Sequence, residues 1–319
     1  MKNLIKILQL IFILICSSAV TAFPDKPIRI IVPFSPGGGT DLVARTISEG
    51  MSRELGQSVV VENRPGAGTT IGTDFVVKSP ADGYTLLLAT FAQAVNPSLI
   101  KNLTYNASRD LIPVAMVGNS PNVLVVPSQS PFQSVADVIT YAQKFPGKLT
   151  YASQGNGTSA HLAGELFISL TKVDMVHIPY KGASQAITDV LGGQVQMTFA
   201  TASAAANLVR GGKLKALAVT TKERSASWPN TPTMIEAGVK DYGMESWYGV
   251  CAPVGTPREI VMKLNAAVSA ATKTRFFTSK LEEEGLMARA ASPESFGQYI
   301  KQEELRWEKI IQAAKIRLD

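Results

Sequence analysis

Two glycine-rich segments carry the residues best suited to bind a small anion. Each follows a short apolar run and precedes a helical pattern, so each lies between a predicted strand and a predicted helix. The first segment consists of Phe34, Ser35, Pro36, Gly37, Gly38, Gly39, Thr40 and Asp41. The binding candidates of the second segment are Ser153, Gly155, Asn156, Gly157, Thr158, Ser159 and His161.

The chemistry of such segments favours anions over other ligands. Glycines expose backbone N–H groups and permit close approach, and the first N–H groups of a helix lie at the positive end of its dipole. A hydrogen bond to a charged group contributes about 1.5–3 kcal/mol, and micromolar binding needs about 8 kcal/mol. A few such donors would therefore hold a carboxylate without an arginine. Simple turn formation is the alternative explanation for each segment taken alone.

The sequence gives little support for a catalytic site or a metal site. The chain has only two histidines, His161 and His177, and neither has a partner at metal-ligand spacing. Cys251 lies in an apolar run, where packing is expected rather than reactivity. Tyr180 ends a predicted strand and could contact a ligand held by the two glycine-rich segments. We expect no catalytic residue and no metal site.

Cofactor and nucleic-acid binding are also disfavoured. The segment Gly66–Gly72 approximates a dinucleotide fingerprint, but it has an extra spacer and does not directly follow a strand. Lys plus Arg exceed Asp plus Glu by 31 − 25 = 6, and this excess forms no basic run interleaved with aromatic residues. We therefore expect no cofactor and no nucleic-acid partner.

The first 22 residues are typical of a signal peptide. Lys2 and Lys6 precede an apolar run from Ile7 to Ile15, and small residues lead to a cleavage site after Ala22. The apolar run is shorter than the roughly 20 residues that span a bilayer. We therefore expect export to the periplasm. Cys251 is then the only thiol of the mature chain, so the fold must depend on its core rather than on an internal disulfide.

Composition and periodicity predict an α/β protein. Of the 319 residues, 45% are hydrophobic and 18% are charged, which favours a folded chain. Its length suggests two domains, although a single barrel would also fit. Strand and helix patterns alternate, as expected for mostly parallel sheets covered by helices. The predicted strands are Ile28–Val32, Val59–Val61, Thr85–Ala89, Leu149–Ala152, Met175–Ile178, Val195–Phe199 and Leu214–Val219. The predicted helices are Asp41–Leu55, Ser159–Leu170, Ala183–Leu191, Arg258–Thr272, Thr274–Glu284 and Pro293–Ala314.

Two extended, Pro-bounded segments are candidates for crossings between two lobes. They are Pro113–Val126 and Glu245–Pro253. If these segments pair, lobe 1 comprises residues 23–121 and 248–319, and lobe 2 comprises residues 122–247.

Motifs along the whole mature chain carry a family resemblance. They are Phe23–Arg29, Pro33–Asp41, Glu62–Gly68, Ala81–Leu86, Asn96–Leu99, Tyr151–Ser153, Gly155–Gly157, His161–Leu166, His177–Gly182, Leu191–Val195 and Gly255–Pro257. In this order they resemble the Bug-type (TctC-like) periplasmic substrate-binding receptors of tripartite tricarboxylate transporters. The resemblance implies a type II-like binding protein whose two lobes close on a small carboxylate, held by loop amides, hydroxyls and ordered waters.

This chain differs from the residues that family members often carry at two places. Family members often carry a His in the loop that corresponds here to Thr90-Phe91-Ala92-Gln93, and an Asp where this chain has Ala200. Without that Asp, a substrate ammonium would lack a partner, so we expect a plain or hydroxylated carboxylate rather than an amino acid.

The sequence thus predicts a periplasmic receptor that performs no covalent chemistry. It would capture a di- or tricarboxylate, or a related organic acid, and deliver it to the membrane permease subunits of the transporter. We expect a monomer. The alternatives are an exported enzyme acting on a small carboxylate, with Asp41 or His161 as base, and a ligand-sensing partner of a membrane kinase.

Overall fold

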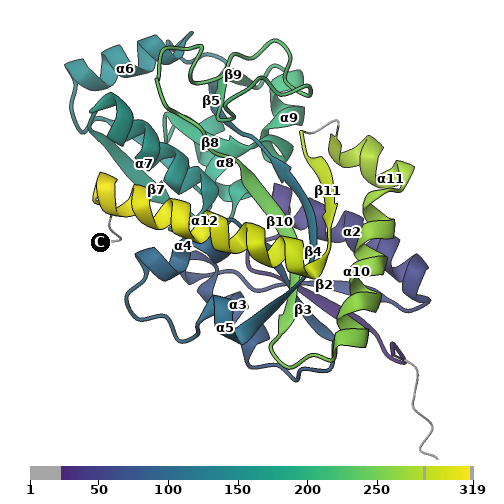
Figure 1. Ribbon diagram of the computed structural model, residues 1–319. Coiled ribbons are helices and arrows are strands. Elements are labelled where there is room, and N and C mark those ends of the chain that lie inside the picture. The colour runs from purple at the N-terminus through teal and green to yellow at the C-terminus, as the bar shows by residue number, and fades with distance from the viewer. Residues whose placement is uncertain (1–22, 283–284, 317–319) are drawn as a thin grey trace, which may run out of the picture.

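The computed structural model describes residues 23–282 and 285–316. It contains two β-sheets, each flanked by helices, and the chain passes from one to the other and back (Figure 1). We call the part built on the six-stranded sheet lobe 1 and the part built on the five-stranded sheet lobe 2. The prediction of a two-lobed α/β protein is confirmed. The predicted signal peptide lies outside the described residues.

The sheet of lobe 1 has four strands that run in one direction and two that run in the opposite direction. In order across the sheet the strands are β11 (Met287–Ala291), β4 (Leu111–Ser120), β10 (Ser246–Pro253), β3 (Thr85–Thr90), β1 (Ile28–Val32) and β2 (Val59–Asn63). β1 pairs in parallel with β2 and β3, whereas β10 is antiparallel to β3 and β4, and β11 is antiparallel to β4.

The sheet of lobe 2 repeats this arrangement. Its strands, in order, are β7 (Met175–Pro179), β6 (Leu149–Ser153), β8 (Met197–Thr201), β5 (Asn122–Pro127) and β9 (Leu214–Val219). β6 pairs in parallel with β7 and β8, and β5 is antiparallel to β8 and β9. Both sheets are therefore mixed: most strands of each sheet run in one direction, and β10, β11 and β5 are reversed. The reason is that β10 and β5 enter their sheets from the other lobe and must run away from it, opposite to β1, β3, β6 and β8.

Helices cover both faces of the sheets. Those of lobe 1 are α2 (Gly39–Leu55), α3 (Thr70–Val77), α4 (Ala92–Leu99), α5 (Ala107–Asp110), α10 (Arg258–Thr272), α11 (Arg275–Phe277) and α12 (Pro293–Ala314), with the short turns η1 (Ala67–Thr69) and η2 (Thr278–Glu282). Those of lobe 2 are α6 (Val135–Lys144), α7 (Ser159–Thr171), α8 (Ala183–Leu191) and α9 (Ala202–Arg210). Within the described ranges no helix has both the length and the apolarity of a membrane span.

The apolar run of β1 reflects burial on both faces. Ile30 packs in a cluster with residues of α2 and α10, and its neighbour Ile31 packs in a second cluster with residues of α3, α4 and α12. Successive strand residues point to opposite faces, so a covered central strand needs apolar side chains at both. α2 buries Val43 and Ile47 on its inner face and ends at Gly56, whose φ is +65°.

The two predicted crossings are present and paired. Pro121 alone separates β4 from β5, and β10 pairs with β4 from Ser246 opposite Ser120 to Pro253 opposite Leu111. Cys251 in β10 is 1% exposed and unpaired. Burial raises the pKa of its thiol to about 12, which fits the packing role expected for it.

Candidate functional site

The first glycine-rich segment connects β1 to the start of α2. Leu42 donates the first hydrogen bond of the helix to the carbonyl of Gly38 at 3.0 Å. The N–H groups of Gly39, Thr40 and Asp41 therefore have no partner within the helix. They lie at the positive end of the α2 dipole, which favours a negatively charged neighbour.

Asp41 stabilises this segment from inside lobe 1. Its carboxylate accepts hydrogen bonds from the Gly37 N–H (3.1 Å), from Arg45 (2.9 and 3.0 Å) and from Asn63 (2.9 Å). Burial acts to raise the pKa of Asp41, but the hydrogen bonds and the guanidinium charge outweigh it and lower that pKa. The Asp41 oxygens are thus engaged with their own lobe and hold the shape of the segment.

The two lobes touch directly beside this segment. Ser35 donates its N–H to the carbonyl of Lys181 at 3.2 Å. Ser184, at the start of α8, donates its hydroxyl to the carbonyl of Pro36 at 3.3 Å. These two bonds join lobe 1 directly to lobe 2.

The start of α2 meets the start of α9. A Cβ atom placed on Gly39 would overlap the Oγ of Ser203 and lie 2.9 Å from the Oγ1 of Thr201, the residue that precedes α9. Gly39 thus permits an approach that no other residue type allows. Two helix N-termini, one from each lobe, converge at this point.

A group of buried hydroxyls surrounds this convergence. Tyr248, Thr201, Ser203 and Thr40 are 1%, 3%, 7% and 8% exposed. The hydroxyls of Ser246, Ser203, Thr201 and Thr40 lie close enough to the Tyr248 hydroxyl to oppose the rise in its pKa that burial causes. Even so, the hydroxyl oxygens of Tyr248, Thr201 and Ser203 have no hydrogen-bond partner in good geometry among the described residues. Buried polar groups normally have one, so these three are available to a bound ligand.

A second contact between the lobes involves η1 and α4. Asn96 donates its side-chain amide to the carbonyl of Gly68 (2.8 Å) and to Thr69 (3.2 Å). A Cβ atom on Gly68 would lie 2.5 Å from the carbonyl oxygen of Asn156, and one on Gly157 would overlap the Oδ1 of Asn96. That Oδ1 is buried and, within the described part of the chain, unpaired.

The second glycine-rich segment is held by its own hydrogen bonds. The carbonyl of Gly155 accepts from the hydroxyls of Thr158 (2.6 Å) and Ser153 (3.1 Å), and Gly157 donates its N–H to Nδ1 of His161 (3.2 Å). Leu162 donates the first intrahelical bond of α7, to Thr158. The N–H groups at positions 159–161 thus lack a partner within the helix, as at the start of α2.

The two histidines form a buried stack. The ring centres of His161 and His177 lie 4.2 Å apart, and Nε2 of His177 is 2.6 Å from the Oγ of Ser153. Burial, with the neighbouring His177, lowers the pKa of His161 to about 3, and burial lowers the pKa of His177 to about 4. Both rings are therefore neutral at neutral pH and make weak general bases there. Both rings contact the second segment, His161 through the Gly157 N–H and His177 through the Ser153 hydroxyl.

Other predicted site residues have partners outside this convergence. The ring of Phe91 packs edge-on against Trp307 of α12 at 4.9 Å. Tyr180 donates its hydroxyl to Asp189 at 2.5 Å, and burial together with this bond raises its pKa to about 12. Ala200 lies in the apolar cluster of lobe 2.

Thr90 is buried at the end of β3 and pairs with Tyr248 in β10. Thr90 therefore lies next to the cluster of buried hydroxyls that includes Tyr248.

The two glycine-rich segments close against different parts of the opposite lobe. The first meets α8 and α9, and the second meets η1 and α4. Sequence reasoning missed Thr201, Ser203, Tyr248 and Asn96 as site candidates. The available signal was Thr201-Ala202-Ser203, a hydroxyl-bearing turn between a strand and a helix.

Two lobes that close helix N-termini over buried, unpaired hydroxyls define a two-lobed binding protein. In the described ranges no group of three or more His, Cys, Asp or Glu side chains has metal-binding geometry.

The chain belongs to the family of tripartite tricarboxylate transporter receptors, TctC, whose model matches residues 43–316. The resemblance inferred from the sequence motifs is confirmed.

Solved structures support the same assignment. The periplasmic binding protein BugD is 34% identical with a TM-score of 0.89, and the match covers 92% of this chain and 99% of that one. MatC from Rhodopseudomonas palustris, solved with bound malate, is 32% identical with a TM-score of 0.87 and coverages of 91% and 100%. Rpa4515 of R. palustris, solved with adipate, is 38% identical with a TM-score of 0.89 and coverages of 92% and 99%. Membership in this family implies a periplasmic solute-binding receptor.

Proposed function

We propose that this protein captures a small di- or tricarboxylate, or a related organic acid, between its lobes and delivers it to the membrane subunits of a tripartite tricarboxylate transporter. The observation that carries the proposal is the convergence of the α2 and α9 N-termini on the unpaired hydroxyls of Thr201, Ser203 and Tyr248. N–H and O–H donors in a buried setting bind a carboxylate strongly, because hydrogen bonds to a charged acceptor are short and strong.

The relatives narrow the ligand class. Malate, bound by MatC, is a hydroxylated dicarboxylate, and adipate, found with Rpa4515, is a plain one. In this chain Ala200 stands in the lobe 2 core and supplies no carboxylate for an ammonium group. We therefore favour plain or hydroxylated carboxylates over amino acids in the cleft.

The proposed binding residues come from both lobes. They are Phe34 to Asp41, Thr90, Phe91, Ser153, Gly155 to Ser159, His161, Tyr180 and Ala200, with Thr201, Ser203, Tyr248 and Asn96 added from the structure. Asp41, Phe91, His161 and Tyr180 would act by shaping the segments, since their side chains already have partners.

The mechanism would be hinge closure without covalent chemistry. A ligand that contacts both lobes stabilises the closed state and thereby increases its population. The lobes would comprise residues 23–121 with 248–319, and residues 122–247, with closure about the paired strands β4 and β10. The mature chain would begin after Ala22 and act as a periplasmic monomer.

Solution scattering tests this proposal. The mature protein is measured alone and with malate, adipate and citrate, and the ligands are then recovered and analysed by NMR. The expected result is a smaller radius of gyration with at least one acid, which is recovered unchanged. Chemical conversion of the acid would favour the enzyme alternative, and an unchanged radius with all three would count against the receptor.

A further inference from the structure

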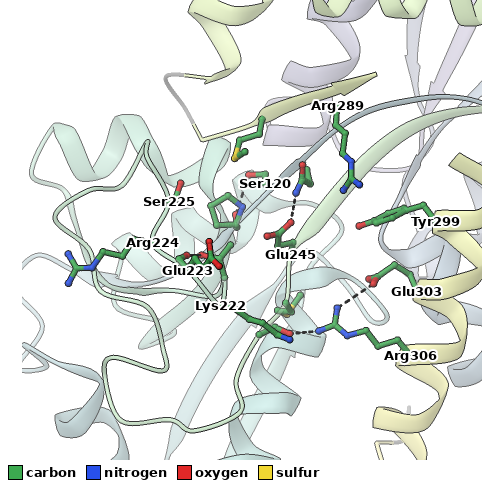
Figure 2. A pocket seen from close by; sticks show the side chains of 16 residues that line it. Ser120, Lys222, Glu223, Arg224, Ser225, Glu245, Arg289, Tyr299, Glu303 and Arg306 are labelled. Atoms are coloured by element: carbon green, nitrogen blue, oxygen red, sulfur yellow. Dashed lines mark hydrogen bonds and ion pairs between the residues drawn. The ribbon is translucent and has the colours of Figure 1, made fainter. Parts of the chain in front are cut away.

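A pocket of about 630 Å³ lies where the chain crosses between the lobes (Figure 2). We call it the hinge pocket. Its walls come from the end of β4, the segment after β9, the start of β10, β11 and α12, and include Ser120, Lys222, Glu223, Ser225, Glu245 and Arg289. We call the proposed carboxylate site between the lobes, at the starts of α2 and α9, the cleft. β4 and β10 separate β11 from β3 and β1, whose ends lead into the cleft. The hinge pocket is therefore a different site from the cleft.

Some of the charges around the hinge pocket are already neutralised. Arg306 pairs with Glu303 at 3.3 Å, and Glu303 also accepts a hydrogen bond from Trp307 at 3.2 Å. Arg224 pairs with Glu236 at 2.9 Å, and Figure 2 shows its side chain directed away from the pocket. These groups contribute little net charge to a ligand.

The remaining charges are of both signs. Arg289, Lys222 and Glu223 form no ion pair with any described residue, and Glu245 accepts a hydrogen bond from Asn119. The Arg289 guanidinium stands 5.7 Å from the centre of the Tyr299 ring. In Figure 2 Arg289 lies on one side of the pocket and Glu223 on the other, with Glu245 between them.

A buried hydroxyl adds a further unsatisfied group. Ser225 is 7% exposed, and its Oγ has no hydrogen-bond partner among the described residues. A buried polar atom without a partner costs stability, so a ligand that supplies one gains by occupying the site. Ser225 and Glu223 both come from the segment after β9, so they line the same wall of the pocket.

Electrostatics then selects the ligand class. A simple anion beside Arg289 would also face Glu245 and Glu223, and a simple cation beside those carboxylates would face Arg289 and Lys222. A zwitterion satisfies both walls, because its carboxylate accepts a bidentate pair of hydrogen bonds from a guanidinium while its ammonium faces the carboxylates. The pocket volume is within the usual range for small-molecule sites.

We propose that the hinge pocket binds a small zwitterion with the chemistry of a free α-amino acid. The ligand carboxylate lies at Arg289, and the ammonium group lies at Glu223 and Glu245 near Ser225.

Calorimetric titration of the mature chain with the common free α-amino acids tests the proposal. The best binder is then compared with its deaminated and decarboxylated analogues, and all are titrated into Arg289→Gln and Glu223→Gln. Arg224→Gln is the matched control, since its guanidinium pairs with Glu236 and its side chain is directed away from the pocket (Figure 2). Loss of a charge-assisted contact predicts binding weaker by about tenfold or more for either variant and either analogue. Arg224→Gln is expected to stay within about twofold of wild type, as is usual for an exposed ion pair.

A cleft variant separates the two sites. Thr201→Val/Ser203→Ala is expected to lose carboxylate binding and to keep amino-acid binding, whereas Arg289→Gln is expected to do the reverse. The proposal is overturned if no amino acid binds, or if an analogue with a single charge binds as tightly as the amino acid. It is also overturned if amino-acid binding is lost in the cleft variant and kept in Arg289→Gln. Thermal unfolding of each variant verifies its fold. Failure of the carboxylates alone would count only against the cleft proposal.

Discussion

Gly39 of lobe 1 and Ser203 of lobe 2 lie in direct contact across the boundary between the lobes. A Cβ atom on Gly39 would overlap the Ser203 hydroxyl, whereas one on the preceding Gly38 would lie at an ordinary 3.4 Å from Ala183. The close approach of the lobes therefore requires glycine at position 39, whereas an alanine side chain would fit at position 38.

Substitution of Gly39 by Ala should impair closure. Its φ is not in the left-handed region, so Ala can be placed in α2 without backbone strain and the cost falls on the closed state. We expect ligand affinity to fall by about tenfold, or about 1.4 kcal/mol, with little change in melting temperature. Calorimetry with the best carboxylate measures this. Gly38→Ala is the control, and equal effects at the two positions would contradict the close approach of α2 and α9.

The buried hydroxyls should contribute directly to affinity. Thr201→Val and Ser203→Ala each remove one donor, and a hydrogen bond to a charged group is worth about 1.5–3 kcal/mol. Thr171→Val is the control in the same lobe, because that hydroxyl donates only to its own helix, at Phe167. If the cleft variants bind carboxylate as tightly as the control does, these hydroxyls do not hold the ligand.

Asp41→Asn should loosen the first glycine-rich segment. An amide offers one acceptor oxygen where the carboxylate offers two, so donors from Gly37, Arg45 and Asn63 that now share both oxygens would lose part of their acceptors. We expect a loss of about 1–3 kcal/mol in unfolding free energy, together with weaker binding. Urea titration measures the stability. The comparison variant is Asp74→Asn, which breaks the ion pair with Lys78 on the surface of lobe 1 but leaves an oxygen that can accept from the Thr104 hydroxyl. It should cost less than about 1 kcal/mol. A larger loss from Asp74→Asn would refute the assigned role of Asp41.

The histidine stack predicts acid sensitivity. The pKa values of His161 and His177, about 3 and about 4 when folded, lie below the ordinary 6.5. The unfolded chain therefore takes up protons first, and stability falls as pH drops from 6.5 toward about 4, by up to about 1.4 kcal/mol per pH unit for each ring. NMR titration of the imidazole signals checks this. Both rings should remain neutral at pH 5.5, and titration near pH 6.5 would show that they are not buried as described.

Much of the fold was predictable because local signals agree with the tertiary structure. Ile28–Val32, Ala183–Leu191 and Arg258–Thr272 have the predicted bounds. β8 begins two residues later than predicted, at Met197, because the N–H groups of residues 194 and 195 bond to Asp189 and complete the turn after α8.

The C-terminal part shows where local signals fail. The predicted helix Thr274–Glu284 is broken into α11 and η2 within the described residues, and β11 was missed. β11 is an edge strand, Met-Ala-Arg-Ala-Ala, whose side chains are largely exposed. Its sequence therefore lacks the β-branched and apolar pattern by which strands are recognised.

The candidate site was predictable only in part. The glycine-rich segments stand out because a turn between a strand and a helix needs unusual residues. Tyr248 lies in an apolar crossing strand, and only the approach of Thr201 and Ser203 from the other lobe turns its hydroxyl into part of a site. A single sequence contains no record of such a long-range contact.

A crystal structure of the mature protein with its tightest-binding dicarboxylate tests the central claim most directly. We predict that one carboxylate of the ligand accepts hydrogen bonds both from N–H groups at the start of α2 and from the hydroxyl of Thr201 or Ser203. A ligand held by one lobe alone, or bound away from the α2 and α9 N-termini, would contradict it.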